Sequence, residues 1–164
     1  MTLQFSENAR KEISAKMEQL PDKGSALIPA LYIAQREFGY LSPEVMEYLA
    51  GELGVPVSEV RAVATFYTMF NKEPVGKYHI QVCQNLTCSL LGAESLISYL
   101  EQKLGITCGQ ITPDGKFSLS RVECLGSCGT APVMQVNDDY FENLTAEKID
   151  QIFVELDKKA NQPC

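Results

Sequence analysis

Apolar residues recur every three or four positions through residues 6–70, which is the spacing of one face of a helix. Four helices are predicted, with these apolar faces: Ala9, Ile13 and Met17; Leu27, Leu31, Ala34 and Phe38; Val45, Met46, Leu49 and Leu53; Val60, Val63, Ala64 and Tyr67. Pro29 fits the first turn of the second helix. The hydroxyls of Ser42 and Ser58 can cap the third and fourth. Residues 6–70 therefore predict a small all-helical unit.

The period changes to two after Pro74, where Tyr78, Ile80 and Val82 alternate with polar residues and predict a strand that ends at Cys83. The next predicted element is a helix with the apolar positions Ala93, Leu96, Ile97, Leu100 and Leu104, followed by a turn at 112–115 and a strand over 116–124. A further strand is predicted on Val133, Met134 and Val136, with a hairpin turn at 137–139 after it. The last predicted helix is capped by Thr145 and has Ile149, Ile152, Phe153 and Leu156 on one face. This order describes a small sheet with helices packed on it.

The two patterns together predict an α+β chain with two domains. The first is a small helical bundle in residues 1–73, and the second is an α/β domain in residues 74–164. Pro74 and Gly76 interrupt both kinds of element, so we expect the boundary near them.

Composition restricts the partners and the compartment. Asp and Glu number 21 against 14 Lys and Arg in 164 residues, which gives a net charge of −7. A chain of this charge repels phosphate backbones, so we expect no nucleic acid partner. The first residues lack the pattern of a secretory signal, and no apolar run reaches membrane-spanning length. We therefore expect a cytoplasmic protein without direct membrane insertion, in which stable disulfides are rare.

Four of the six cysteines form two close pairs, Cys83-x4-Cys88 and Cys124-x3-Cys128, and each pair follows a predicted strand. Adjacent strands lie about 4.8 Å apart, so neighbouring strand ends can bring the two pairs together. A structural zinc site also uses two pairs of thiolates with similar spacers. A thioredoxin-type dithiol fits less well, because it uses one pair separated by two residues.

An iron–sulfur cluster is the other candidate for the four thiols. Its core and thiolates carry a negative charge that must be surrounded by N–H donors. Gly126, Ser127, Gly129 and Thr130 are small, so their backbone amides can approach sulfur. The spacing differs from that of plant-type ferredoxins. Spacing alone leaves the choice between iron–sulfur and zinc open.

The remaining candidate groups have ordinary interpretations. Cys108 is expected to be a buried or half-buried thiol, and Cys164 a terminal one. His79 is the single histidine and is expected at the surface, and one histidine excludes the two that a Rieske centre needs. The aromatics of residues 65–70 are expected to pack between the modules. No glycine-rich nucleotide loop is present, so NADH and flavin are expected on a partner.

Three segments carry a family resemblance: VCQNLTC at 82–88, VECLGSCGTAPVMQVND at 122–138 and VRAVATFYTMF at 60–70. They resemble the thioredoxin-like 2Fe-2S subunit of respiratory NADH:quinone oxidoreductase, complex I, over roughly residues 6–157. The resemblance implies a thioredoxin-like ferredoxin domain after the helical bundle. It also implies that Cys83, Cys88, Cys124 and Cys128 bind one 2Fe-2S cluster.

The resemblance further implies an electron-transfer subunit with no independent active site. Its partner would be the flavin-carrying, NADH-oxidising subunit, which holds FMN and NADH, together with other subunits of a complex peripheral to the inner membrane. Similar subunits occur in NAD-linked hydrogenases and formate dehydrogenases, which remain alternatives. A zinc-stapled scaffold is the third possibility.

Overall fold

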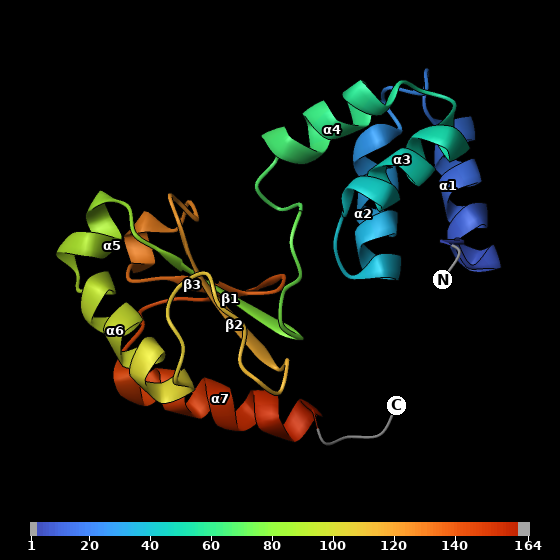
Figure 1. The fold of residues 1–164 in the computed structure, drawn as a ribbon. Coiled ribbons are helices and arrows are strands. Elements are labelled where there is room, and N and C mark those ends of the chain that lie inside the picture. The colour runs from blue at the N-terminus through green and yellow to red at the C-terminus, as the bar shows by residue number, and fades with distance from the viewer. Residues whose placement is uncertain (1–2, 161–164) are drawn as a thin grey trace. The chain divides into compact units, whose positions relative to one another are not determined.

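The computed structural model describes residues 3–160, which divide into two compact units. The first unit extends to Val75 and the second begins at Gly76 (Figure 1). Each unit has its own hydrophobic core. Helices form the first unit and a sheet with helices forms the second, so the predicted α+β class is confirmed.

The first unit contains the four predicted helices, α1 (Glu7–Gln19), α2 (Leu27–Phe38), α3 (Pro43–Leu53) and α4 (Val57–Phe66). The apolar residues of their predicted faces form one core, with Leu31, Leu49 and Val60 fully buried. The Ser42 hydroxyl accepts a hydrogen bond from the backbone N–H of Val45 at 3.3 Å, which confirms the predicted cap of α3. Pro29 lies in the first turn of α2, as expected.

The start of α4 differs from prediction. Helix α4 begins at Val57 with Pro56 at the N-cap and has no side-chain cap, so the predicted cap by Ser58 is wrong. Proline fixes an extended backbone just before the helix, which sets its start without a hydroxyl. Of the aromatics in residues 65–70, Phe70 is buried in the core of this unit, whereas Phe66, the last residue of α4, is exposed.

The second unit is built on a four-stranded sheet of order β2-β1-β3-β4. Its elements are β1 (Tyr78–Cys83), α5 (Leu86–Leu90), α6 (Ala93–Leu104), β2 (Phe117–Val122), the 3-10 turn η1 (Cys128–Thr130), β3 (Met134–Val136), β4 (Asp139–Phe141) and α7 (Ala146–Ala160). Strands β1 and β2 are parallel, and β3 is antiparallel to both β1 and β4. Asn137 has a φ of 53° in the two-residue turn between β3 and β4, at the predicted hairpin.

Helices α6 and α7 contribute to a single core with the strands. Alternate strand residues, among them Ile80, Leu119 and Met134, face Ile97 of α6 and Ile149 of α7. Because strand side chains alternate between faces, one face of the sheet is covered by both helices and the other carries polar residues. The predicted apolar faces of both helices are thus confirmed.

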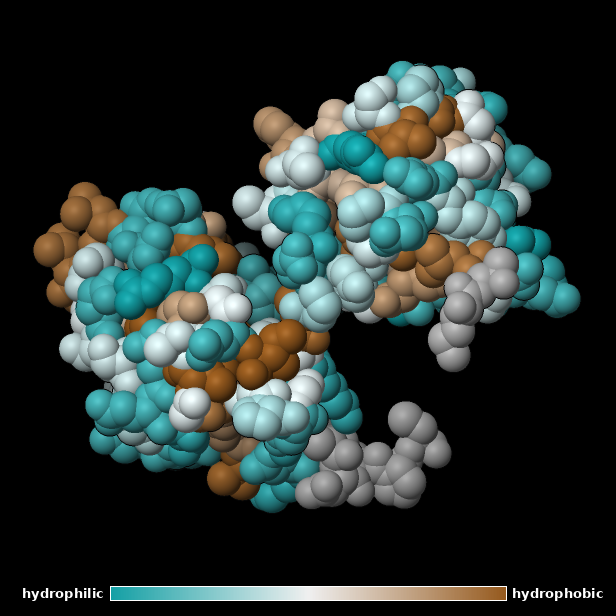
Figure 2. All heavy atoms as spheres, viewed as in Figure 1, coloured by the Kyte–Doolittle hydropathy of each residue, from teal (hydrophilic) through white to brown (hydrophobic). Residues whose placement is uncertain are grey.

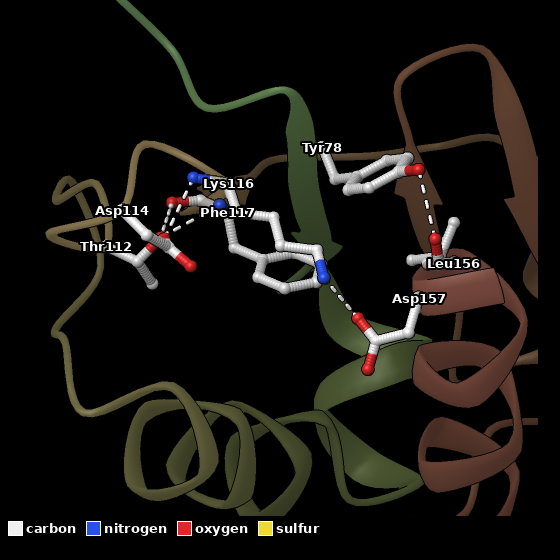
Figure 3. A network of polar contacts seen from close by, with 7 residues as sticks. All are labelled: Tyr78, Thr112, Asp114, Lys116, Phe117, Leu156 and Asp157. Carbon is white, nitrogen blue, oxygen red and sulfur yellow. Dashed lines mark hydrogen bonds and ion pairs between the residues drawn. The ribbon is translucent and has the colours of Figure 1, made fainter. Parts of the chain in front are cut away.

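Polar contacts fasten the end of α7 beside the strands, as Figure 3 shows. The Tyr78 hydroxyl donates to the Leu156 carbonyl at 3.1 Å, and the Lys116 ammonium pairs with Asp157.

The Thr112 hydroxyl both donates to an Asp114 carboxylate oxygen and accepts from the N–H of Phe117. These contacts shape the predicted turn that leads into β2.

Candidate metal centre

Strands β1 and β2 bring Cys83 and Cys124 to the same edge of the sheet. The two strands run parallel, with Cys83 paired to Val122, so both chains leave the sheet in the same direction. Cys83 is the last residue of β1, and Cys124 follows the end of β2 after one intervening residue. The backbone N–H of Gln84 donates to the Val122 carbonyl at 2.9 Å and continues the pairing beyond β1. Adjacent parallel strand ends therefore position one cysteine of each pair.

The short helix α5 presents Cys88, and sequence reasoning did not predict this helix. The Asn85 side chain accepts from the backbone N–H of Leu86 at 2.7 Å and caps its start. Cys88 is buried next to Cys83 in a small apolar cluster with Ala93 and Val133. One turn of helix thus directs the second thiol of the pair back toward the first.

The second pair lies in the loop between β2 and β3. Cys124 and Cys128 are both exposed, and Cys128 opens the η1 turn. The N–H of Gly126 donates to the Cys124 sulfur at 3.3 Å, and Gly126 has a φ of 76°. A positive φ costs glycine no side-chain strain, so this tight approach of amide to sulfur follows from the residue type. The sequence argument about small residues holds at Gly126.

The four sulfurs interact electrostatically. Burial raises the pKa of the Cys88 thiol to about 11, and its neighbours Cys83 and Cys128 act in the same direction. Burial also raises the pKa of Cys83. However, hydrogen bonds from the N–H groups of Asn85 and Leu125 and from the thiols of Cys88 and Cys124 outweigh burial and leave it below its ordinary value. These interactions link Cys83 to Cys88 and Cys124, and Cys88 to Cys128.

The donor set at this edge matches the chemistry of a ferredoxin site. Cys83, Cys88, Cys124 and Cys128 are free thiols. The N–H of Gly126 donates to the Cys124 sulfur, and the backbone amides of Asn85 and Leu125 lower the pKa of Cys83, as that of Val133 lowers the pKa of Cys88. Within residues 3–160, no three side chains of Cys, His, Asp or Glu are placed to hold a single metal ion. A binuclear cluster takes two thiolates on each iron, and two thiol pairs with amide donors are the residues that it requires.

The other candidate residues lie apart from this arrangement. Cys108 is half-buried, as expected, and burial raises its pKa, while its polar neighbours are Arg121 and Glu101. His79 is half-buried rather than at the surface. Its ring nitrogen Nε2 lies 2.8 Å from the Ser120 hydroxyl of the neighbouring strand, on the polar face of the sheet. Cys164 lies outside the described residues.

A sheet covered by helices on one face, with a cysteine at the end of one parallel strand and another just beyond its neighbour, is the arrangement expected of a thioredoxin-like domain. The sequence pattern of the thioredoxin-like [2Fe-2S] ferredoxin family matches residues 11–157, and the chain belongs to this family. The fold and the family predicted from the sequence are therefore confirmed.

Named relatives extend the comparison. The chain is 52% identical to a subunit of the NADH-quinone oxidoreductase of Rhizobium meliloti over 87% of this chain and 85% of the relative. It is 43% identical to a subunit of the NADH-quinone oxidoreductase of Thermus thermophilus over 93% of this chain and 86% of the relative. Among solved structures, an NAD+-reducing [NiFe]-hydrogenase in the H2-reduced state matches with a TM-score of 0.70 and 26% identity. That match covers 84% of this chain but only 23% of the hydrogenase chain.

Proposed function

We propose that this chain is an electron-transfer subunit of NADH:quinone oxidoreductase and that Cys83, Cys88, Cys124 and Cys128 hold one 2Fe-2S cluster. The observation that carries the proposal is that the two cysteine pairs follow the adjacent parallel ends of β1 and β2, with the N–H of Gly126 bonded to the Cys124 sulfur. Membership of a [2Fe-2S] family and relatives named as subunits of NADH-quinone oxidoreductase support it.

The residues of this chain divide the work of holding such a group. The bound cluster would supply a site that accepts and returns one electron at a time. Cys83 and Cys88 are 3% exposed each, so the apolar cluster around them excludes water from one side. The amides of Asn85, Leu125, Gly126 and Val133 stabilise negative charge on sulfur. Cys124 and Cys128 leave the other side exposed, which keeps an electron path to a partner short.

The partner that fits is the flavin-carrying subunit that oxidises NADH, since this chain has no nucleotide loop. Helix α5 carries the buried Cys88 and, on its outer side, Leu86 and Leu90, which are 71% and 77% exposed; Leu91, directly after the helix, is 57% exposed. Figure 2 shows this end of the second unit as an apolar patch. Apolar patches of this kind mark protein interfaces, and this one lies directly over a proposed cluster ligand. We assign it to the flavin-carrying subunit.

Attachment to the membrane would then be indirect, through the other subunits of the complex. No helix in the described part of the chain is long and apolar enough to span a bilayer.

An equivalent place in an NAD-linked hydrogenase is the second candidate, favoured by the structural match to an NAD+-reducing [NiFe]-hydrogenase. The partner that copurifies with the tagged chain separates the two hosts, because one carries nickel and the other reduces quinone.

Purified protein tests the cluster and the division of labour together. We expect about two iron and two sulfide per chain, and an EPR signal from a single unpaired spin only after reduction with dithionite. The pure, flavin-free chain should not oxidise NADH with an artificial acceptor. A colourless protein that carries one zinc would contradict the proposed cluster, and NADH turnover by the chain alone would contradict the proposed partner.

A further inference from the structure

The loop that carries Cys128 has little regular structure to hold it. Between β2 and β3 it contains only the three-residue turn η1, and Cys128 itself is exposed. A thiolate that must stay within bonding distance of a metal needs a fixed backbone on both sides. The residues that flank Cys128 therefore determine how firmly its backbone is held in place.

Glu142, in the connection between β4 and α7, holds both flanks of this turn. Its Oε1 atom accepts hydrogen bonds from the hydroxyl of Ser127, directly before Cys128, and from the hydroxyl of Thr130, at 2.7 Å. The two hydroxyl oxygens lie 2.9 Å apart, so they converge on one carboxylate oxygen. The Ser127–Glu142 and Thr130–Glu142 contacts join segments 15 and 12 residues apart in the sequence.

The backbone around Glu142 strengthens the same connection. The N–H of Asn143 donates to the Thr130 carbonyl at 2.6 Å, and the N–H of Leu144 donates to the Pro132 carbonyl at 3.1 Å. The Lys148 ammonium donates to the Glu142 carbonyl at 2.6 Å and so ties the connection to the first turn of α7. Four hydrogen bonds, two of them to the carboxylate, thus join the cysteine loop to residues 142–144, and the Lys148 bond joins these residues to α7.

Glu142 is charged in this arrangement. Hydrogen bonds from Ser127 and then Thr130 hold the pKa of its carboxyl below the ordinary value, with a further contribution from the Lys148 charge. Hydrogen bonds to an ionised acceptor are roughly twice as strong as neutral ones. An anionic side chain bonded to the residue directly before a proposed cluster ligand also disfavours the addition of an electron.

We propose that Glu142 is a positioning residue for the cluster: its carboxylate fixes the turn that presents Cys128, and its charge lowers the reduction potential. This inference rests on the proposed 2Fe-2S site. One side chain would then have two separable effects. Its hydrogen bonds hold the loop, and its charge changes the reduction potential of the cluster.

Two substitutions in the full-length protein separate the effects. Glu142→Ala removes both hydrogen bonds and the charge, so loss of iron to a chelator should be about tenfold faster, the equivalent of a lost charge-assisted bond. Glu142→Gln keeps an oxygen that can accept from the hydroxyls but removes the charge. It should retain the cluster at a rate close to that of the wild type and raise the midpoint potential in an EPR-monitored titration. Glu155→Gln, an exposed carboxylate of α7, makes the same change of charge as a control.

The results for these variants either support the proposed role of Glu142 or contradict it. Faster iron loss in Glu142→Ala, with a raised potential in Glu142→Gln and neither effect in Glu155→Gln, supports the proposal. If Glu142→Ala fails to fold, the Glu142→Gln potential and the iron retention of Ser127→Ala still test it. Wild-type retention and potential in all Glu142 and Ser127 variants would overturn it. A wild-type chain that never takes up iron would instead contradict the proposed site itself.

Discussion

At the scale of single residues, the two cysteine pairs differ in their surroundings. Cys83 and Cys88 are buried in an apolar cluster, whereas Cys124 and Cys128 lie exposed on a loop. The raised pKa of Cys88, about 11, means that its thiol is protonated at neutral pH without a metal. Metal binding must then displace this proton, so cluster assembly should release acid and become less favourable at low pH.

Substitution of single cysteines tests the ligand assignment. Cys88→Ala or Cys124→Ala should leave one iron with a missing protein ligand, so we expect most of the iron and sulfide to be lost during purification. Cys108→Ala is the matched control, because that thiol contacts Arg121 and Glu101 instead. Iron analysis and the visible spectrum measure the effect. A Cys108→Ala variant that loses iron would show that the ligand set is wrong.

The single histidine supplies a prediction about pH. Burial lowers the pKa of His79 below its ordinary value of 6.5, so the folded protein binds this proton less readily than the unfolded chain. The contribution of the neutral His79 to the free energy of unfolding is therefore fully present above pH 6.5. It is lost as the pH falls through the lower pKa of the folded state. An NMR titration of the imidazole C–H signals should give a midpoint below that of the urea-denatured chain. A midpoint equal to or above that of the denatured chain would contradict this.

Residue types and spacing singled out the four cysteines as candidate ligands, but they did not indicate Glu142. Paired cysteines beyond strand ends are visible in the sequence, and the parallel pairing of β1 and β2 brings them to one edge. Glu142 is one of 21 acidic residues, and its partners Ser127 and Thr130 lie on another segment. No periodicity or motif marks a contact that arises only when the hairpin returns to the loop.

At the scale of elements, long amphipathic helices were predictable and the short α5 was not. Helix α6 was expected from its apolar stripe and from Gly105, which ends it in a left-handed conformation. Helix α5 has only five residues, too few for a helical stripe, and Asn85 was its one local signal. The element that positions Cys88 was therefore missed, although Cys88 itself was not.

Leu90 tests the interface proposed for α5. Leu90→Asp places a charge in the exposed apolar patch, where desolvation on binding would be costly, so affinity for the flavin-carrying subunit should fall at least about tenfold. Because the side chain is 77% exposed, iron content and thermal stability should stay at the wild-type level. Val154→Asp, at an exposed apolar position on α7, provides the control. Equal affinities of the wild type and both variants would remove the patch from the interface.

Gly76 tests the start of the second unit. Its N–H donates to the Ser118 hydroxyl at 3.0 Å, and a Cβ there would lie 2.5 Å from the Phe117 carbonyl carbon. Gly76→Ala must push β1 from β2, so we expect destabilisation of about 1–3 kcal/mol or more. Gly51→Ala in α3 has open space and should stabilise the first unit by about 0.5–1 kcal/mol. Urea denaturation measures both, and an unchanged midpoint for Gly76→Ala would argue against this close packing.

At the scale of the whole molecule, the chain joins two units with separate cores. The change from helical to alternating periodicity predicted a boundary near residue 74, because each period requires a different kind of core. All of the proposed ligands and Glu142 belong to the second unit, and the first contains no cysteine. The helical unit carries no chemical motif, so the role predicted for it is docking to the partner.

A fragment that begins at Asn71 tests how the functions are divided. The second unit has its own core of strands, α6 and α7, and the cysteine cluster lies within it, so the fragment should fold and retain about two iron per chain. It should nevertheless bind the flavin-carrying subunit at least about tenfold more weakly than the whole chain, because two linked binding surfaces raise affinity through effective concentration. Titration calorimetry with the intact chain as reference measures the difference. If the fragment binds as tightly as the intact chain, the helical unit makes no contribution to docking and the α5 patch alone accounts for it.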